Sequence, residues 1–196
     1  ISRYMAAKDT PLMAFAHLGG VWAPCGQLTL TEEGPRLLAS SFAYGMNYLK
    51  RAGALEVDPV ALSLADKAAV TAKRLLPVAG LPFFGGIRDA APDAWGRRVI
   101  EAKLKVPANS LPESQYLLHA GSDRVGALDI RSHITDAPAA GASAWHSLAH
   151  LVEAASRIDE GLPVPAHLDA IFQGGSALGG ARPKASIRDE QGILWL

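Results

Sequence analysis

Short apolar runs of strand length recur along the first 44 positions of the chain. Glycine or proline separates the successive apolar runs, and both residue types interrupt strands. Four runs of strand length occupy residues 12–18, 21–23, 27–31 and 35–44. The pattern therefore predicts a small antiparallel β-meander at the start of the chain.

A helical period follows these short apolar runs after residue 91. Trp95 and Val99 are spaced i, i+4 and share a helix face with further apolar residues. Pro92 suits the first helical turn, and Asp93 suits the positive end of the helix dipole. We predict a helix over residues 92–104 that buries Trp95 against the N-terminal sheet.

Weaker signals fill the rest of the chain. Between the meander and this helix we predict a strand at 59–64, a helix at 66–76 and a loop at 81–86 whose two phenylalanines pack inward. After it we predict a helix from a capping box at Ser110 through His119, a strand at 125–130, a surface linker at 136–142, helices at 145–161 and 165–172, and a β-hairpin from 184–188 and 193–196. The predicted fold class is α+β.

Composition narrows the classes of function. The 196 residues are 49% hydrophobic, enough to build a core, and 19 Lys and Arg balance 19 Asp and Glu. A net charge of zero argues against strong direct binding to nucleic acid. Cys25 is the only cysteine, so we expect a small buried residue in a reducing, cytoplasmic protein. No apolar run is long enough to cross a bilayer.

The stretch from Gly174 to Lys184 carries the strongest chemical signal. Glycine lets backbone N–H groups converge on an anion, and two cations in the same stretch can neutralise a phosphate. The predicted phosphate-binding residues are Gly175, Ser176, Gly179, Gly180, Ala181, Arg182 and Lys184. The spacing departs from that of a Walker loop, because Gly180 rather than lysine follows Gly179. A flexible glycine turn between a helix and a hairpin is the alternative.

We predict no metal site in this chain. His146 and His150 are spaced i, i+4, as two ligands on one helix face would be. Residue 147 is serine, however, so the signature of zinc proteases is missing, and no third ligand is evident. A solvated or partly packed helix face explains the two histidines.

Three stretches resemble, in the same order, segments of the HipA-type serine/threonine kinases, which are the toxins of bacterial toxin–antitoxin modules. Residues 175–184 resemble the glycine-rich loop of that family, residues 85–98 its pre-kinase helix motif, and residues 121–128 its G-x-D-x-V-G-A-L segment. The resemblance implies an N-terminal β-rich subdomain with its linking helix over 1–108, and the beginning of a kinase-like core over 109–196.

The resemblance also implies a function for a longer parent protein. That parent would bind ATP and Mg²⁺, transfer phosphate to an unidentified protein substrate and associate with a DNA-binding, HipB-like antitoxin. The catalytic Asp, the magnesium ligands and the nucleotide lysine of the family would follow Leu196, so we expect no catalytic residue in this chain and no activity from it alone. Ser176, the hydroxyl of the loop, is the candidate for autophosphorylation, although the simplest alignment places Ala177 at the family's serine.

Two other classes of function stay open. A non-catalytic, antitoxin-like binding module of the same family would resemble the N-terminal subdomain, but such a subunit would end before the glycine-rich stretch. An amidase-signature hydrolase has a similar segment rich in glycine and serine, but Ala177 stands where that family needs a serine.

Overall fold

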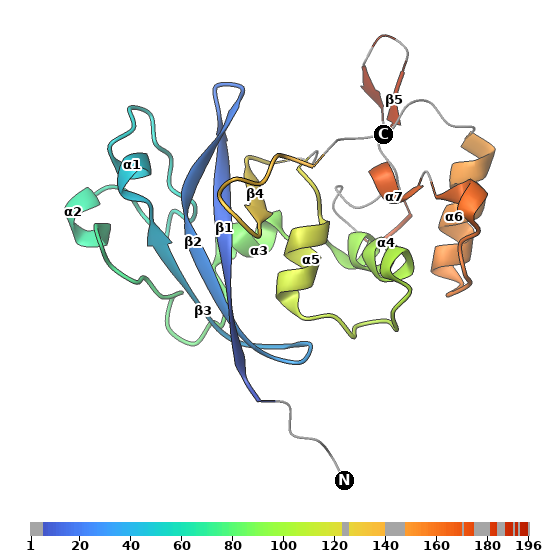
Figure 1. Ribbon diagram of the computed structural model, residues 1–196, viewed down its shortest axis with the longest axis horizontal. Coiled ribbons are helices and arrows are strands. Elements are labelled where there is room, and N and C mark those ends of the chain that lie inside the picture. The colour runs from blue at the N-terminus through green and yellow to red at the C-terminus, as the bar shows by residue number, and fades with distance from the viewer. Residues whose placement is uncertain are drawn as a thin grey trace. The chain divides into compact units, whose positions relative to one another are not determined.

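The structure is a computed structural model that describes residues 6–122, 126–139, 148–169, 171–174, 181–183, 187–189, 191 and 193–195. Its strands are β1 (Lys8–Leu18), β2 (Val21–Glu33), β3 (Arg36–Tyr44), β4 (Leu128–Arg131), β5 (Ile187–Arg188) and β6 (Leu194–Trp195) (Figure 1). Its helices are α1 (Met46–Leu49), α2 (Lys67–Val70), α3 (Gly85–Ala90), α4 (Ala94–Leu104), α5 (Glu113–His119), α6 (Leu148–Asp159), the 3₁₀ helix η1 (Ala166–Leu168) and α7 (Ile171–Gly174). The α+β class predicted from the sequence is confirmed.

The chain forms two compact units. The first unit comprises Ile1–Ala91, Pro112–Leu118 and Gly126–Pro138. The second unit comprises Pro92–Leu111, His119–Val125 and Ala139–Leu196. The chain therefore passes between the units several times, and the division into domains at residue 108 stays a prediction.

The first unit is built on a four-stranded antiparallel sheet with the order β3-β2-β1-β4. The predicted meander is confirmed, but residues 21–33 form one strand rather than two. Ala14 pairs with Gly26 and Phe15 with Pro24, so Cys25 is the extra residue of a β-bulge. Pro24 is tolerated because pairing with β3 begins only at Gly26, and a proline without an N–H donor therefore breaks no bond on that side.

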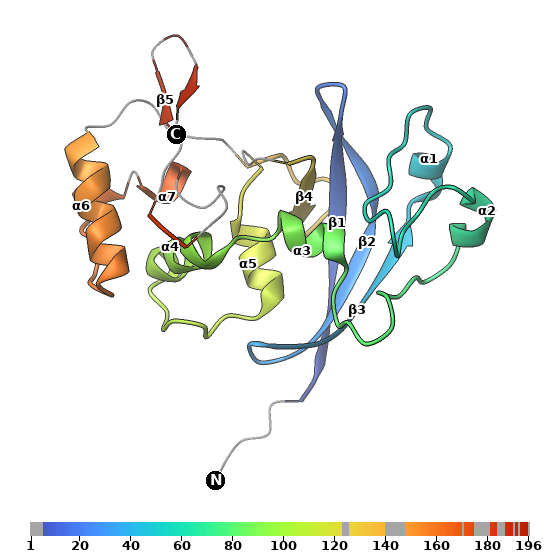
Figure 2. The ribbon, with the colours of Figure 1, turned by 180° about the vertical axis from the view of Figure 1, so that it is seen from behind.

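The core of the first unit lies on one face of this sheet. Figure 2 shows α3 lying beside the sheet near β1 and β4. Phe83 and Phe84 are buried as predicted, and the ring of Phe84 meets that of Phe42 edge to face. Cys25 is fully buried, and burial raises the pKa of its thiol to about 12. The thiol is therefore protonated at neutral pH, which agrees with a packing role.

Two predictions for the segment after β3 are wrong. Residues 59–64 form turns instead of a strand, because the Asp58 carboxylate accepts hydrogen bonds from the N–H groups of Val60 and Ala61. The helix expected over 66–76 is limited to α2, which Asp66 caps. Downstream of α2, Leu75 pairs with Phe42 at the edge of β3, and this pairing holds the backbone extended.

Asp58 also holds the start of α3, a helix that the sequence analysis missed. Its Oδ1 atom binds the turn at Val60 and Ala61, while its Oδ2 atom accepts a hydrogen bond of 2.9 Å from the N–H of Gly86. Burial by itself raises the pKa of this carboxyl group, but the backbone donors of Ala61, Gly86, Val60 and Gly85 outweigh burial and lower it. The ionised form is therefore the one that the fold stabilises.

This arrangement predicts a pH dependence of stability. Because the pKa of Asp58 is lower in the folded chain, its contribution is complete above the unfolded value near 3.8 and disappears as the pH falls through the folded value. Asp58→Asn should lower the free energy of unfolding by about 2 kcal/mol at pH 7. The hydrogen bonds from the Val60 and Ala61 N–H groups would lose their charge assistance, and the NH₂ group of asparagine would face the Gly86 N–H, which it cannot accept. Urea unfolding of both proteins between pH 7 and pH 3 should show this difference shrinking below pH 4. A difference that is constant with pH would contradict it.

The start of α5 depends on a residue far away in sequence. The helix forms at Glu113–His119 as predicted, and Gly121 follows it with a φ of +77°. The hydroxyl of Ser110, expected to cap this helix, instead donates to the Pro107 carbonyl. The buried Glu32 carboxylate, from β2, accepts hydrogen bonds from the Ser114 N–H and hydroxyl.

The second unit has its own hydrophobic cluster. Trp95 and Val99 of α4 pack with residues of α6, η1 and α7, namely Leu151, Ala154, Ile158, Leu168 and Ile171. The helix and the burial of Trp95 are confirmed, and Asp93 caps the helix by accepting from the Gly96 N–H. The predicted partner of Trp95 is wrong, because these helices rather than the N-terminal sheet enclose it. The apolar face of α4 can be read from the sequence, but the sequence pattern does not say which element covers that face.

The remaining elements of the second unit follow the predicted order with two changes. The helix expected over 145–161 is observed as α6, and Gly161 follows it with a φ of +70°. The helix expected over 165–172 is divided into η1 and α7. The predicted hairpin is present as β5 and β6. No helix in the described part of the chain is both long and apolar enough to cross a membrane.

Candidate functional site

The glycine-rich stretch lies between α7, which ends at Gly174, and the β5–β6 hairpin. Five of its predicted phosphate-binding residues fall outside the described residues: Gly175, Ser176, Gly179, Gly180 and Lys184. The candidate autophosphorylation site, Ser176, is therefore among them. Ala181 and Arg182 are described, and both are exposed. The described geometry of the site is therefore that of the residues at the two ends of the stretch and of their contacts.

Arg98 of α4 holds the C-terminal end of the stretch. Its Nη2 atom donates to the Ala181 carbonyl at 2.7 Å, and its Nη1 atom donates to the carboxylate of Asp159. The centre of the guanidinium lies 5.4 Å from the centroid of the Trp95 ring. The helix that resembles the pre-kinase motif thus makes a direct contact with the stretch that resembles the glycine-rich loop.

The hydrophobic cluster of the second unit holds the other end. Ile171, the first residue of α7, is almost completely buried in the same cluster as Trp95 and Val99. Since α7 leads directly to the glycines, one helix, α4, supports the chain on both sides of the stretch. Burial of large apolar side chains makes this support rigid compared with a surface loop.

Asp189 organises the hairpin that follows. Its Oδ1 atom accepts from the N–H groups of Gln191 and Ile193, and its Oδ2 atom accepts from the Trp195 indole N–H at 2.7 Å. The Asp189 N–H in turn donates to the Ile193 carbonyl. One aspartate therefore closes the turn and ties it to β6, as the turn composition predicted.

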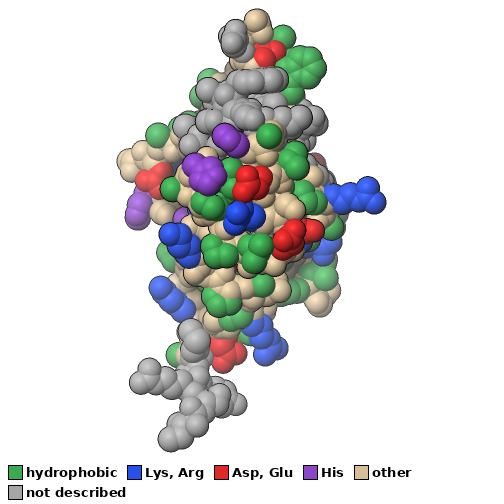
Figure 3. Space-filling model, turned by 90° about the vertical axis from the view of Figure 1, so that its right-hand side faces the viewer, with side chains coloured by type: hydrophobic (Ala, Val, Ile, Leu, Met, Phe, Trp, Pro, Cys, Tyr) green, Lys and Arg blue, Asp and Glu red, His purple; other side chains and the backbone are tan. Residues whose placement is uncertain are grey.

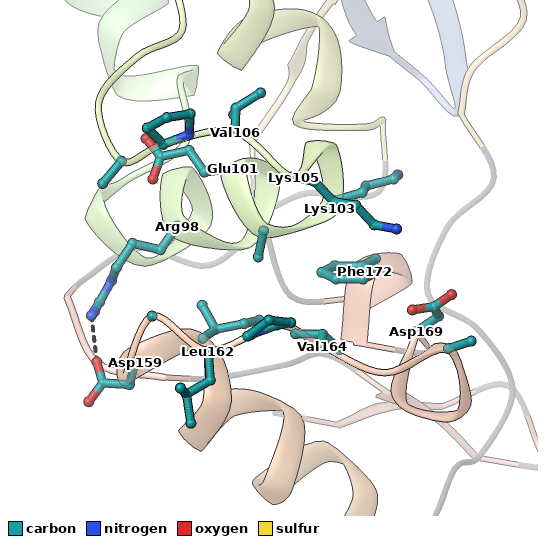
Figure 4. Close-up of a pocket in the computed structure, with 17 residues that line it drawn as sticks. Arg98, Glu101, Lys103, Lys105, Val106, Asp159, Leu162, Val164, Asp169 and Phe172 are labelled. Carbon is teal, nitrogen blue, oxygen red and sulfur yellow. Dashed lines mark hydrogen bonds and ion pairs between the residues drawn. The ribbon is translucent and has the colours of Figure 1, made fainter.

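A pocket of about 1180 Å³ lies within the second unit, between α4 and residues 158–172 (Figure 4). Figure 4 shows Arg98 directed at Asp159 at one end, while Lys103 and Lys105 lie near Phe172 and Asp169 at the other. The cations Arg98, Lys103 and Lys105 are matched in number by the acids Glu101, Asp159 and Asp169. The lining therefore favours neither an anionic nor a cationic ligand as a class.

The charges around this unit are mixed rather than segregated. Burial lowers the pKa of His119, and the positive charge of Lys103 lowers it further.

Figure 3 shows cationic, acidic and histidine side chains interspersed with small hydrophobic patches on the side of the molecule that carries α6.

Histidines and acids do not converge on a metal in the described part of the chain. No group of three or more His, Cys, Asp or Glu side chains there is placed to hold an ion. His146 lies outside the described residues, and the rings of His150 and His167 are 6.2 Å apart.

Sequence reasoning did not single out Arg98, because a solvated helix face explains a pair of neighbouring arginines equally well. The Arg97 Nε–H donates to the Pro92 carbonyl of the preceding turn, whereas Arg98 reaches Ala181, 83 residues further along the chain. Neighbouring arginines look alike in a helical pattern, so only the fold separates their roles. The available signal was that Arg98 ends the segment resembling the pre-kinase motif.

No protein-family model and no curated protein sequence matches this chain.

Proposed function

We propose that this chain is the N-terminal portion of a HipA-like protein serine/threonine kinase, in which residues 174–184 bind the phosphates of ATP. The observation that carries the proposal is the hydrogen bond between Arg98 and Ala181. Three stretches resemble the family in sequence order, and this bond joins two of them in space. Such a contact is expected if the motifs belong to one functional assembly.

The division of roles within the proposed site follows from residue chemistry. Glycine N–H groups would face the phosphates, and Arg182 and Lys184 would add charge-assisted contacts. Arg182 is exposed and therefore accessible to an anion. In the family, Mg²⁺ and a catalytic aspartate neutralise and orient the transferred phosphoryl group, and these belong to the parent protein beyond Leu196. The protein substrate and the antitoxin partner are likewise proposals for that parent.

The test is ATP binding by the full-length protein with Gly179 and Gly180 both replaced by valine. Valine side chains would block the close approach of backbone to phosphate, so we expect ATP affinity to fall about tenfold or more. Folding stability should change little if these glycines serve the ligand. Isothermal titration with ATP and thermal unfolding are measured on the same variant.

The opposite pattern would reject a phosphate site. If the glycines form only a turn, valine lowers stability wherever φ is positive and leaves nucleotide affinity unchanged. A full-length protein that binds no ATP at all would also reject the proposed function. The double alanine variant at the same positions provides a graded control, because alanine adds one carbon where valine adds three.

A further inference from the structure

Arg98 joins three segments that are far apart in sequence. It lies on α4, its carboxylate partner Asp159 is the last residue of α6, and its carbonyl partner Ala181 follows the glycines. The two partners are 61 and 83 residues away. All three residues belong to the second unit.

The position of Asp159 points to a specific role for this pair. An acidic side chain at the C-terminus of a helix faces the negative end of the helix dipole, which disfavours it. Arg98 supplies the compensating charge. The side chains of Arg98 and Asp159 are 34% and 52% exposed, so the ion pair adds little to stability. Its effect is to hold the guanidinium in one orientation.

That orientation determines where the next backbone donor points. The peptide between Ala181 and Arg182 is trans and planar, so its C=O and N–H groups point in opposite directions. Because the Ala181 carbonyl is turned toward Arg98, the Arg182 N–H is turned away from it. Pro183 has no N–H, so the Arg182 amide is the last backbone donor before Lys184.

We propose that Arg98 is a positioning residue that orients the Ala181–Arg182 peptide, so that the Arg182 N–H and side chain face the phosphates of a nucleotide. The nucleotide part of this inference rests on the proposed function. Arginine is required because its planar fork binds two acceptors at once, whereas lysine is a point charge without that geometry. Lysine at position 98 can keep the pair with Asp159 but does not hold the carbonyl in the same orientation.

The contact is tested on this chain by nuclear magnetic resonance. The dipeptide Ala-Arg occurs once in the sequence, at residues 181–182. Labelling alanine carbonyls with ¹³C and arginine amides with ¹⁵N therefore isolates the signal of this one peptide. In Arg98→Lys and Arg98→Gln we expect the Ala181 carbonyl resonance to shift and the heteronuclear NOE of the Arg182 amide to fall.

Arg157→Gln is the matched control. Arg157 also lies in the second unit, pairs with Glu153 and donates to a backbone carbonyl, that of Pro163. Its loss should leave the signal of the Ala181–Arg182 peptide unchanged. Thermal unfolding of each variant shows whether the chain remains folded. An unchanged signal in both Arg98 variants overturns the inference.

ATP titration of the full-length protein separates this inference from the proposed function. We expect Arg98→Lys to weaken ATP binding by about three- to tenfold, the change typical of one hydrogen bond. If the wild-type protein binds ATP and Arg98→Lys binds it equally well, Arg98 does not position the nucleotide site and the inference fails. If the wild type binds no ATP while the peptide signal still changes in the variants, the proposed function fails and the orienting contact stands.

Discussion

Replacing Trp95 by alanine is expected to lower the free energy of unfolding of the second unit by about 3–5 kcal/mol, the usual cost of removing a buried aromatic side chain. Trp95 is completely buried, and residues from α4, α6, η1 and α7 form its cluster. Because these helices are short, they depend on this packing rather than on helix propensity. Urea unfolding followed by circular dichroism measures the change.

Trp195→Ala provides the control for this experiment. Trp195 is 53% exposed, and its indole N–H donates to Asp189 within the hairpin. Its removal should cost about 1 kcal/mol or less, the value of one hydrogen bond at the surface. Equal losses in the two variants would contradict the assignment of Trp95 to the core of the second unit. A loss confined to Trp95→Ala agrees with it.

The elements that sequence patterns predict well are those whose cause is local. The β-meander follows from short apolar runs separated by glycine and proline, α4 from its apolar face, and the hairpin from the turn residues around Asp189. The pattern also predicted that Trp95 is buried, but it contains no information about which element covers the residue.

The errors have causes that are distant or sterically specific. The two strands predicted at 21–23 and 27–31 form the single strand β2, because a β-bulge at Cys25 accommodates Pro24 within the strand. The strand expected at 59–64 is replaced by turns that Asp58 closes, and the same carboxylate binds α3 near Gly86. A side chain that closes its own turn and also binds a backbone N–H 28 positions further along has no periodic signature in the sequence.

The candidate site was predictable as chemistry but not as geometry. Glycines with nearby cations predict an anion site whatever the surroundings, so Ala181 and Arg182 are candidates from the sequence alone, and their role stays a prediction. Arg98 was not a candidate, because its role depends on Asp159 and Ala181 lying within reach of one guanidinium. In a helical pattern, an arginine that orients a backbone and an arginine that only meets solvent are identical.

Gly86→Ala should lower the free energy of unfolding of the first unit by about 3 kcal/mol, which is the upper end of the usual cost of overpacking. A Cβ atom on Gly86 would lie 2.2 Å from the Val57 carbonyl oxygen and 3.2 Å from the Cα of Asp58. Both obstacles are backbone atoms, so relief requires α3 to move away from residues 57–58. That movement also weakens the hydrogen bond from the Gly86 N–H to the Asp58 carboxylate, leaving part of a buried acceptor unsatisfied.

Gly85→Ala separates this steric cause from helix propensity. Both glycines lie in the first turn of α3, so alanine raises helix propensity similarly at each position. The nearest atom to a Cβ on Gly85 is Oδ2 of Asp58 at 3.3 Å, which a small side-chain adjustment relieves. We expect Gly85→Ala to change stability by about 1 kcal/mol or less. Equal losses of stability in the two variants, measured by urea unfolding, would contradict the prediction. They would show that the close approach of Gly86 to the Val57 carbonyl does not limit the stability of α3.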